Sequence, residues 1–322
     1  MKALAVTGMD ALAPFLSRNA IFLVLLVLFA AAVTVSDAFL DSSYLFNVVR
    51  QVSPVGIAAI GVTFVMVLGG VDLSVGAVIS LSAVLCAVQM NGDAANIPIA
   101  VAAACLTGTA VGALNGFALA FTRVSPFILT LGVGVAVFGL TQIYSGGTAR
   151  GVVAPGFREF FNHRIEGFVP VIALAFIALA SLGLLVQKTT VFGRELFLIG
   201  SNRRAAILSG LPVARVTILA YALSGLFGAM AGIALLARSG VSNTLSGQGL
   251  EFQVLAAVVL GGTTFEGGRG GIAGTVAGVL VLVIAFNLVN IAGLPYHIQL
   301  VVMGGIIILA SALYGQLSAR AE

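Results

Sequence analysis

The chain has 322 residues, of which 60% are hydrophobic and only 8% are charged. About a quarter of the residues of a soluble globular protein are charged, so this composition excludes that class. A membrane-spanning helix takes about 20 mostly apolar residues, and the apolar content is enough for roughly nine or ten of them. The net charge of +4 comes from short basic segments between apolar runs, which set membrane orientation and do not indicate nucleic-acid binding.

Ten apolar spans follow along the chain, and they predict an all-α polytopic membrane protein. We expect one transmembrane domain over residues 20–316, between a tail of residues 1–19 and a tail of residues 317–322. The first run is long for the core of a cleaved signal peptide, so it is interpreted as a retained helix. The spans are predicted at 20–39, 52–68, 74–90, 97–121, 124–144, 168–187, 217–237, 252–265, 271–293 and 298–316.

Basic residues lie mainly on one side of these spans. With the N-terminus in the cytoplasm, ten of them fall inside and five outside, as the positive-inside rule requires. Both termini are then predicted to be cytoplasmic. The inner set is Lys2, Arg18, Arg123, Lys188, Arg194, Arg203, Arg204, Arg215, Arg269 and Arg320, and the outer set is Arg50, Arg150, Arg158, Arg164 and Arg238.

A glycine-rich break, GGVDLSVG, separates the second and third spans. It contains Gly69, Gly70, Asp72, Ser74 and Gly76. A carboxylate just before a helix accepts backbone N–H groups and suits the positive end of the helix dipole. Asp72 is therefore interpreted as a cap for the next helix, with Ser74 in its first turn. A gate, or a contact to a neighbouring domain, is the alternative, and the two roles are compatible.

A similar glycine pair occurs later in the chain. Residues 67–70 and 259–262 both read VLGG, and each precedes another apolar run. We expect broken or re-entrant segments near 69–76 and 261–271. Both pairs face the same side of the ten-span arrangement, as a parallel internal repeat would require, and chance similarity is an equally open explanation of four matched residues.

Glycines spaced four apart predict close packing between helices. Gly108, Gly112 and Gly116 share one helix face, where the missing side chains let a neighbouring backbone approach. The alternative is chance in a chain with 40 Gly. The spacing indicates architecture and not activity.

Ionisable residues are absent from the interior of the predicted spans, apart from boundary residues such as Glu251. Ion-coupled transporters commonly place such groups at membrane depth, so the energy for uphill transport is expected from another subunit. A P-loop needs Gly-Lys-Ser/Thr, and neither Lys2 nor Lys188 follows a glycine, which excludes that ATP site. Asp72 stands alone without a base or second carboxylate, so catalysis within the membrane is not supported.

Uncharged polar residues within the spans offer hydrogen bonds to a solute. Sugars need donors and acceptors, but helix contacts in lipid need them too, and both roles stay open. His163 and His297 lie far apart and lack clustered Cys, Asp or Glu, so no metal site is predicted. The candidate path residues are Asn115, Thr130, Gln142 and Asn287, with Gln253 and Asn290 as further polar positions.

The loop at 188–216 contains a predicted short helix. Asn202 is a suitable N-cap for a helix from Arg203 to about Ser209, and Gly210 ends it. Such a helix is too short and polar to span a membrane. It is interpreted either as a surface that docks in a groove of a partner protein or as a connector whose arginines fix topology.

Four separated sequence blocks resemble the signature blocks of ribose-type permeases, the membrane subunits of ABC importers for monosaccharides. They are GGVDLSVG at 69–76, SPFILTLG at 125–132, FGRELFLIGSNRRAAILSGLPV at 192–213 and AAVVLGGTTFEGGRGGIAGT at 256–275. The resemblance covers residues 20–316, in order and with similar spacing.

This resemblance implies a bacterial inner-membrane permease that works as a pair, as two copies or with a related second chain. It implies a cytoplasmic ATPase, which would bind ATP and Mg, and a periplasmic sugar-binding protein, while this chain binds no cofactor. It also implies that the loop helix couples to the ATPase. Arg204 stands where an acidic residue is typical, so no salt bridge is carried over there. The coupling residues are Arg203, Arg204, Ala205, Ala206 and Gly210.

A self-sufficient secondary transporter or facilitator of a small polar solute is the alternative function. It would move solute without nucleotide, whereas an intramembrane enzyme would turn over substrate without a partner. The sequence leaves the identity of the sugar open.

Overall fold

The computed structural model describes residues 9–308 except 296 and 306, and side chains from residue 20 onwards. Its regular structure is helical, apart from a hairpin of β1 (Arg164–Ile165) and β2 (Val169–Pro170), in which Arg164 pairs with Pro170. The helices are α1 (Met9–Val35), η1 (Asp37–Leu40), α2 (Ser42–Val67), α3 (Val75–Met90), η2 (Ala94–Asn96), α4 (Ile97–Phe121), α5 (Pro126–Ser145), α6 (Pro155–Asn162), α7 (Val171–Thr189), α8 (Val191–Ser201), α9 (Arg203–Leu208), α10 (Val213–Ser239), α11 (Leu250–Leu260) and α12 (Ile272–Ile291).

The prediction of an all-α polytopic membrane protein is confirmed. Six of the described helical segments are long and apolar enough to cross a bilayer, namely α2, η2 with α4, α5, α7, α10 and α12. Shorter apolar helices lie in α1, α3 and α11. Residues 297–305 and 307–308 are also helical, and the rest of the predicted span 298–316 lies outside the described residues, as do 1–8 and 317–322.

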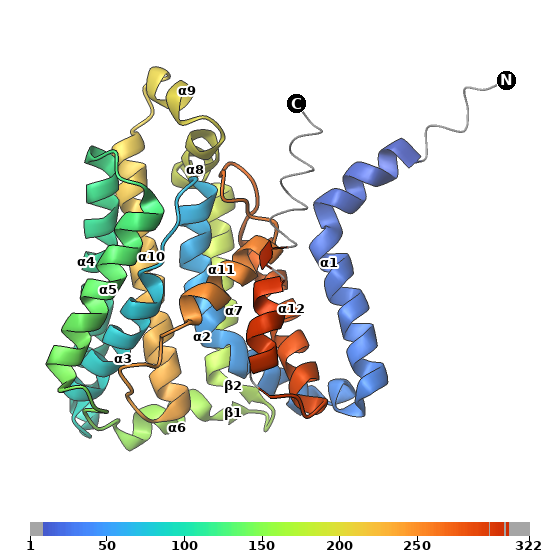
Figure 1. Ribbon diagram of the computed structural model, residues 1–322. Coiled ribbons are helices and arrows are strands. Elements are labelled where there is room, and N and C mark those ends of the chain that lie inside the picture. Colours follow the sequence, from blue (N-terminus) through green and yellow to red (C-terminus); the bar gives the residue numbers. More distant parts are fainter. Residues whose placement is uncertain (1–8, 296, 306, 309–322) are drawn as a thin grey trace.

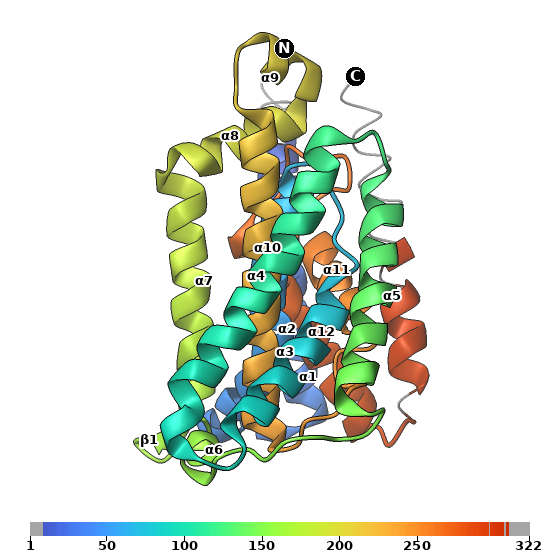
Figure 2. The same ribbon diagram turned by 90° about the vertical axis from the view of Figure 1, so that its left-hand side faces the viewer.

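The long helices share two ends, which we name by the short helices found there. Figures 1 and 2 show α8 and α9 together at one end, the α9 end, and α6 with the β hairpin at the other, the α6 end. Helix α4 ends and α5 begins at the α9 end, so their connection crosses that surface. Helix α2 begins at the α6 end, earlier than the predicted residue 52, because the Asp41 carboxylate accepts the Ser43 N–H at 3.0 Å and starts the helix there.

Helices α2 and α10 form the centre of the bundle. Within the most apolar 18-residue stretch of each helix, 78% of the residues are buried in α2 and 67% in α10. The corresponding share is 22% in α4 and in α5, so these two helices lie at the periphery. Helix α4 lies across α10 (Figure 2) through the predicted glycine face. A Cβ at Gly112 would overlap the Tyr221 carbonyl, and one at Gly225 would overlap the Gly108 carbonyl. The close packing predicted from these spacings is confirmed.

Helices α3, with 16 residues, and α11, with 11 residues, are shorter than the spanning helices and begin inside the bundle. Residues 68–74 run inward from the α9 end to α3, and residues 240–249 run inward from the α6 end to α11 (Figure 1). The two inner ends meet where the Gly247 N–H donates to Ser80 Oγ at 2.9 Å. At about 1.5 Å per residue, the 11 residues of α11 cover roughly half of a hydrocarbon core of about 30 Å.

The two VLGG sequences form the same kind of turn, one residue out of register with each other. Gly69, the third residue of the first VLGG, and Gly262, the fourth residue of the second, both have φ +86°. In each turn the next residue donates its N–H back to the helix, as in a Schellman motif. The first turn follows a helix of 26 residues and precedes one of 16, whereas the second follows a helix of 11 residues and precedes one of 20. The breaks predicted at 69–76 and 261–271 are present, and the inward segment 240–249 is an additional break that the sequence did not indicate.

Candidate functional site

The carboxylate of Asp72 lies at the inner end of segment 68–74 and is 1% exposed. Its Oδ1 accepts from the Ser74 N–H at 2.9 Å and from Ser74 Oγ at 2.6 Å, and its Oδ2 accepts from Ser224 Oγ at 2.7 Å. Asn115 Nδ2 donates to Ser74 Oγ at 2.9 Å. The N-cap position of α3 is Ser74, whose side chain makes no capping bond, so Asp72 orders the turn before the helix and ties it to α10.

The backbone of segment 68–74 is held by side chains of neighbouring helices. Thr130 Oγ1 on α5 accepts from the Leu73 N–H at 3.1 Å and lies 3.3 Å from the Val71 carbonyl. The Tyr221 hydroxyl on α10 donates to the same carbonyl at 3.2 Å. Backbone groups outside a helix need such partners at membrane depth. Two predicted path residues, Asn115 and Thr130, therefore lie at this break and bond to it.

The predicted loop helix is present as α9, and its N-cap is confirmed. Asn202 Oδ1 accepts the Ala205 N–H at 2.9 Å. Of the predicted coupling residues, Ala206 is buried and the other four are exposed. Two apolar side chains of the same helix face outward, since Ile207 is 57% and Leu208 82% exposed. Gly210 ends the turn with φ +76°, and no heavy atom lies within 4 Å of a Cβ placed there.

Helix α8 connects the exposed surface of α9 to the break at segment 68–74. A Cβ at Gly200 would overlap the Val67 carbonyl, so the end of α8 packs directly on the end of α2. The Gly268 N–H donates to the same carbonyl at 2.8 Å. The α8–α9 segment, the start of segment 68–74 and the loop 261–271 thus meet at one point of the α9 end.

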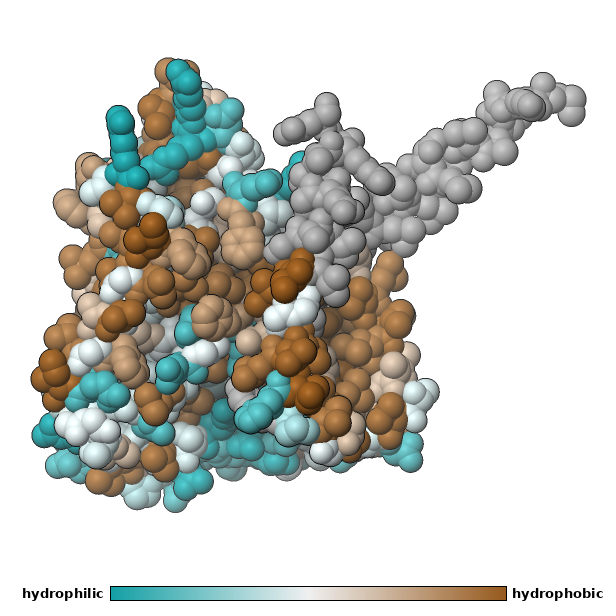
Figure 3. Space-filling model, viewed as in Figure 1, coloured by the Kyte–Doolittle hydropathy of each residue, from teal (hydrophilic) through white to brown (hydrophobic). Residues whose placement is uncertain are grey.

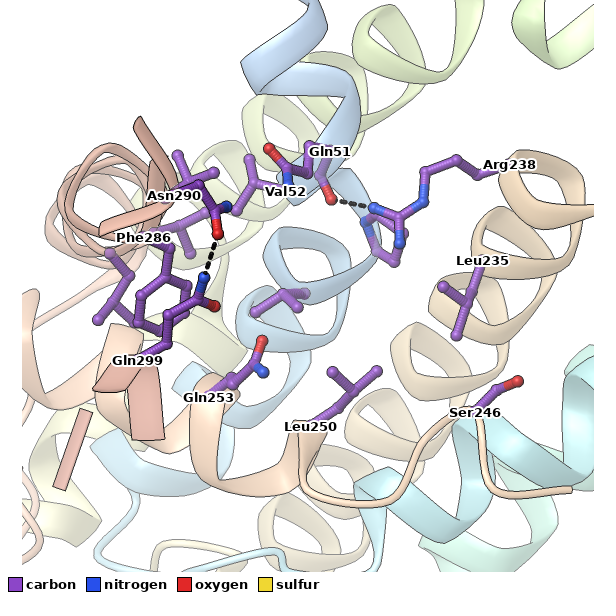
Figure 4. Close-up of a pocket in the computed structure, with 15 residues that line it drawn as sticks. Gln51, Val52, Leu235, Arg238, Ser246, Leu250, Gln253, Phe286, Asn290 and Gln299 are labelled. Atoms are coloured by element: carbon purple, nitrogen blue, oxygen red, sulfur yellow. Dashed lines mark hydrogen bonds between the residues drawn. The ribbon is translucent and has the colours of Figure 1, made fainter. Parts of the chain in front are cut away.

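A cavity of about 290 Å³ lies between α2, α10, α11, α12 and helical residues 297–305. Figure 4 shows its labelled side chains around a common open space. Asn287 borders it, because Asn287 Nδ2 donates to Gln51 Oε1 at 3.2 Å. The polar lining residues are Gln51, Arg238, Ser246, Gln253, Asn290 and Gln299.

Only part of this polar lining was indicated by the sequence. Gln253 and Asn290 fall within predicted spans, but Gln51 and Arg238 lie one residue outside them, although both belong to helices. Ser246 reads as loop in sequence and lies on the inward segment 240–249. Predicted helix boundaries hid Gln51 and Arg238, whereas Gln299 lies within the predicted span 298–316 and was not singled out by the sequence. Gln142 lies on α5 and does not line the cavity.

A shallower groove of about 190 Å³ opens on the outer face of the bundle, between α3, α5 and the start of α11. Its lining includes Glu251, Gln248 and Ser80 beside Leu131 and Val135 of α5. Figure 3 shows polar side chains between apolar surfaces on the face where α5 and α12 are seen. The described residues contain no cluster of three His, Cys, Asp or Glu that could hold a metal ion.

The chain is similar to known permeases over most of its length. A family model described as a branched-chain amino acid transport system / permease component matches residues 44–311. The ribose import permease protein of Bacillus subtilis is 38% identical over 293 residues, which is 90% of each chain. No solved structure matches the chain.

Two further relatives carry other sugar names. The galactose/methyl galactoside import permease protein of Salmonella typhimurium is 35% identical over 319 residues, which is 93% of this chain and 94% of the relative. The L-arabinose ABC transporter permease protein of Azospirillum brasilense is 33% identical over 296 residues, with 92% and 86% covered. Proteins of this kind are transport components of ABC importers and not enzymes. Because the family model matches residues 44–311 and the relatives cover about nine tenths of the sequence, the chain belongs to the ABC importer permease family.

Proposed function

We propose that this chain is the permease of an importer for a monosaccharide and that α9 docks on a cytoplasmic ATPase. The relatives named for ribose, galactose and arabinose support a sugar as the cargo. The ATPase would bind ATP and Mg, and a sugar-binding protein would deliver the cargo at the α6 end. Residues 20–316 act as one permease domain in the bacterial inner membrane, with short tails on the cytoplasmic side.

The distribution of charge supports this orientation. Among the described residues, basic side chains are more frequent at the α9 end than at the α6 end, as the positive-inside rule requires of a cytoplasmic surface. The α9 end carries Arg123, Lys188, Arg194, Arg203, Arg204, Arg215 and Arg269, and the α6 end carries Arg50, Arg150, Arg158, Arg164 and Arg238.

The exposed apolar pair on α9 is the observation that carries the ATPase proposal. Ile207 and Leu208 face outward beside Arg203 and Arg204 on a capped helix that projects from the end of the bundle (Figure 1). An amphipathic helix of this kind fits an apolar groove of a partner. Ala205 and Gly210 keep the helix and its turn free of bulky side chains.

The outer groove supports a second permease copy or a related chain on that face. Glu251 lies at the start of α11, which begins inside the bundle, and lines the groove beside Gly76 of α3. A charged group in that position is costly. A second copy on that face would enclose the groove and cover Glu251.

The break at Gly69, Gly70, Asp72, Ser74 and Gly76 is proposed as the gate. Asn115 and Thr130 hold the gate segment, and Asn287 borders the cavity on the α6 side, while Gln142 remains a proposed path residue on α5. ATP-driven movement of α8 would reach the gate through Val67, which gives the two states that alternating access requires.

Uptake of labelled ribose, galactose and arabinose tests the proposal in cells that lack importers for these sugars and express this chain with its ATPase and binding protein. Leu208→Glu places a charge in the docking surface, so we expect at least a tenfold lower uptake and loss of the ATPase from affinity-purified permease. Val124→Glu, on the α4–α5 connection at the same end, is the control. It should keep normal sugar uptake and should still retain the ATPase during purification. Uptake by this chain that continues without any ATPase would support a secondary transporter instead.

A further inference from the structure

We propose that the cavity of Figure 4 is a transit site for one uncharged monosaccharide in its ring form. This inference rests on the proposed function and adds the place where the sugar is held. Pockets for drug-sized ligands measure about 300–1,000 Å³. The volume of about 290 Å³ lies at the lower limit of that range, so it suits a single sugar ring better than a disaccharide.

The cavity offers hydrogen-bonding groups that the described residues leave free. The carboxamide of Gln253 and the hydroxyl of Ser246 line it and make no hydrogen bond to any described residue. Arg238 donates through Nη1 to the Gln51 carbonyl, and its other N–H groups have no acceptor within the described chain. A sugar hydroxyl is both donor and acceptor, so it can satisfy an amide, a hydroxyl and a guanidinium together.

The rest of the lining is apolar and faces the polar groups. Phe286 on α12 and Leu250 on α11 contribute to it, and Figure 4 shows Phe286 beside Gln299 and Asn290. A sugar ring has C–H groups on its faces and hydroxyls around its edge. Convergent polar groups in a mostly apolar pocket are typical of small-molecule sites.

The charges of the lining distinguish a sugar from an amino acid. Among the described residues that line the cavity, Arg238 is charged and none is Asp, Glu or Lys. An amino acid that enters the cavity would lose the water around its ammonium group and find no carboxylate to replace it, which is unfavourable at membrane depth. The lining therefore favours an uncharged polyhydroxy solute over the amino acids named in the family description.

The position of the cavity suits a solute that enters from the α6 end. Its residues from α2, Gln51 to Val55, lie in the half of that helix nearer the α6 end, and Leu235 and Arg238 lie in the last turns of α10. Gln299 Nε2 already donates to Asn290 Oδ1 at 2.8 Å, so binding replaces some existing bonds. Weak binding follows, and release toward the gate stays fast.

Saturation-transfer NMR on the purified chain in lipid nanodiscs tests this site without the ATPase. The probes are ribose, galactose and arabinose, with leucine as the amino acid. We expect a signal from at least one sugar and none from leucine. Gln253→Leu should lower that sugar signal at least fivefold, and Ser246→Leu, which fills the cavity, should do the same. Gln248→Leu makes the same change as Gln253→Leu in the outer groove and should leave the signal unchanged.

A sugar signal that survives both cavity variants would overturn the inference, as would a leucine signal or the absence of any sugar signal. Folding is checked by the size-exclusion profile, and Gln253 has no partner to lose. If Leu208→Glu abolishes sugar uptake while the cavity variants bind and transport normally, the proposed function stands and this site is wrong. If no sugar is taken up by the assembled importer, the proposed function itself fails.

Discussion

Asp72 is a buried carboxylate whose two oxygens face three donors, from the Ser74 N–H, Ser74 Oγ and Ser224 Oγ. A buried charge is tolerated only where such bonds replace water. Because one of the donors is on α10, the carboxylate joins the break to the centre of the bundle. Its environment therefore fixes where α3 begins.

The variant Asp72→Asn tests this anchoring. It replaces the charged carboxylate by a neutral amide, which can still bond to Ser74 and to Ser224 Oγ. Hydrogen bonds to a charged group are roughly twice as strong as neutral ones, so about 1 kcal/mol of stability is lost. We expect a lower temperature at which half of the detergent-solubilised protein leaves the monodisperse size-exclusion peak. Asp41→Asn is the control, because Asp41 caps α2 on the surface and Asn caps equally well. Equal melting of the two variants would contradict an anchoring role.

At the scale of single elements, the contact between α4 and α10 depends on the absence of side chains. A Cβ at Gly112 would overlap the Tyr221 carbonyl, and rigid backbone on both sides cannot move away. By contrast, a Cβ placed on Gly139 of α5 would have no heavy atom within 4 Å. The two helical glycines therefore differ in packing and not in local conformation.

Gly112→Ala should destabilise the chain by about 1–3 kcal/mol through overpacking. Gly139→Ala should keep or raise stability, because Ala is the better helix former by roughly 1 kcal/mol. The measurement is the same thermal loss from the size-exclusion peak. If both variants melt like the unaltered protein, α4 and α10 do not pack as closely as described.

The sequence predicted the helices well because apolar length is a strong signal in membrane proteins. Each of the ten predicted spans overlaps a helix among the described residues. The inward segment 240–249 was missed because its polar composition reads as a surface loop. The partners of Asp72 were also hidden, since Ser224 and Asn115 lie far away in sequence and only the packing of α4 and α10 brings them to it.

At the scale of the whole molecule, the proposed docking surface, the proposed gate and the cavity follow one another from the α9 end of the bundle toward the α6 end. Helix α8 packs on Val67 at the α9 end, segment 68–74 leads inward to Asp72, and the cavity lies on the α6 side. No spacing in the sequence indicates this order. It depends on two short helices, α3 and α11, which begin inside the bundle after segments that enter from opposite ends, and so on the tertiary packing.

The outer groove makes a final prediction about assembly. If two copies meet across the face that carries Glu251, a cysteine at Val135, which is 66% exposed beside the groove, lies near its partner's equivalent residue. The test starts from a variant in which Cys86 and Cys105 are replaced by Ala. When Val135→Cys is added and membranes are treated with a flexible bis-maleimide, we expect two chains to be cross-linked into a dimer. Leu114→Cys on α4 is 68% exposed and should remain monomeric, because that helix packs on α10 and turns its other side to lipid. A dimer from Leu114→Cys alone would place the second copy on α4, and Glu251 would then need another partner to shield it from lipid.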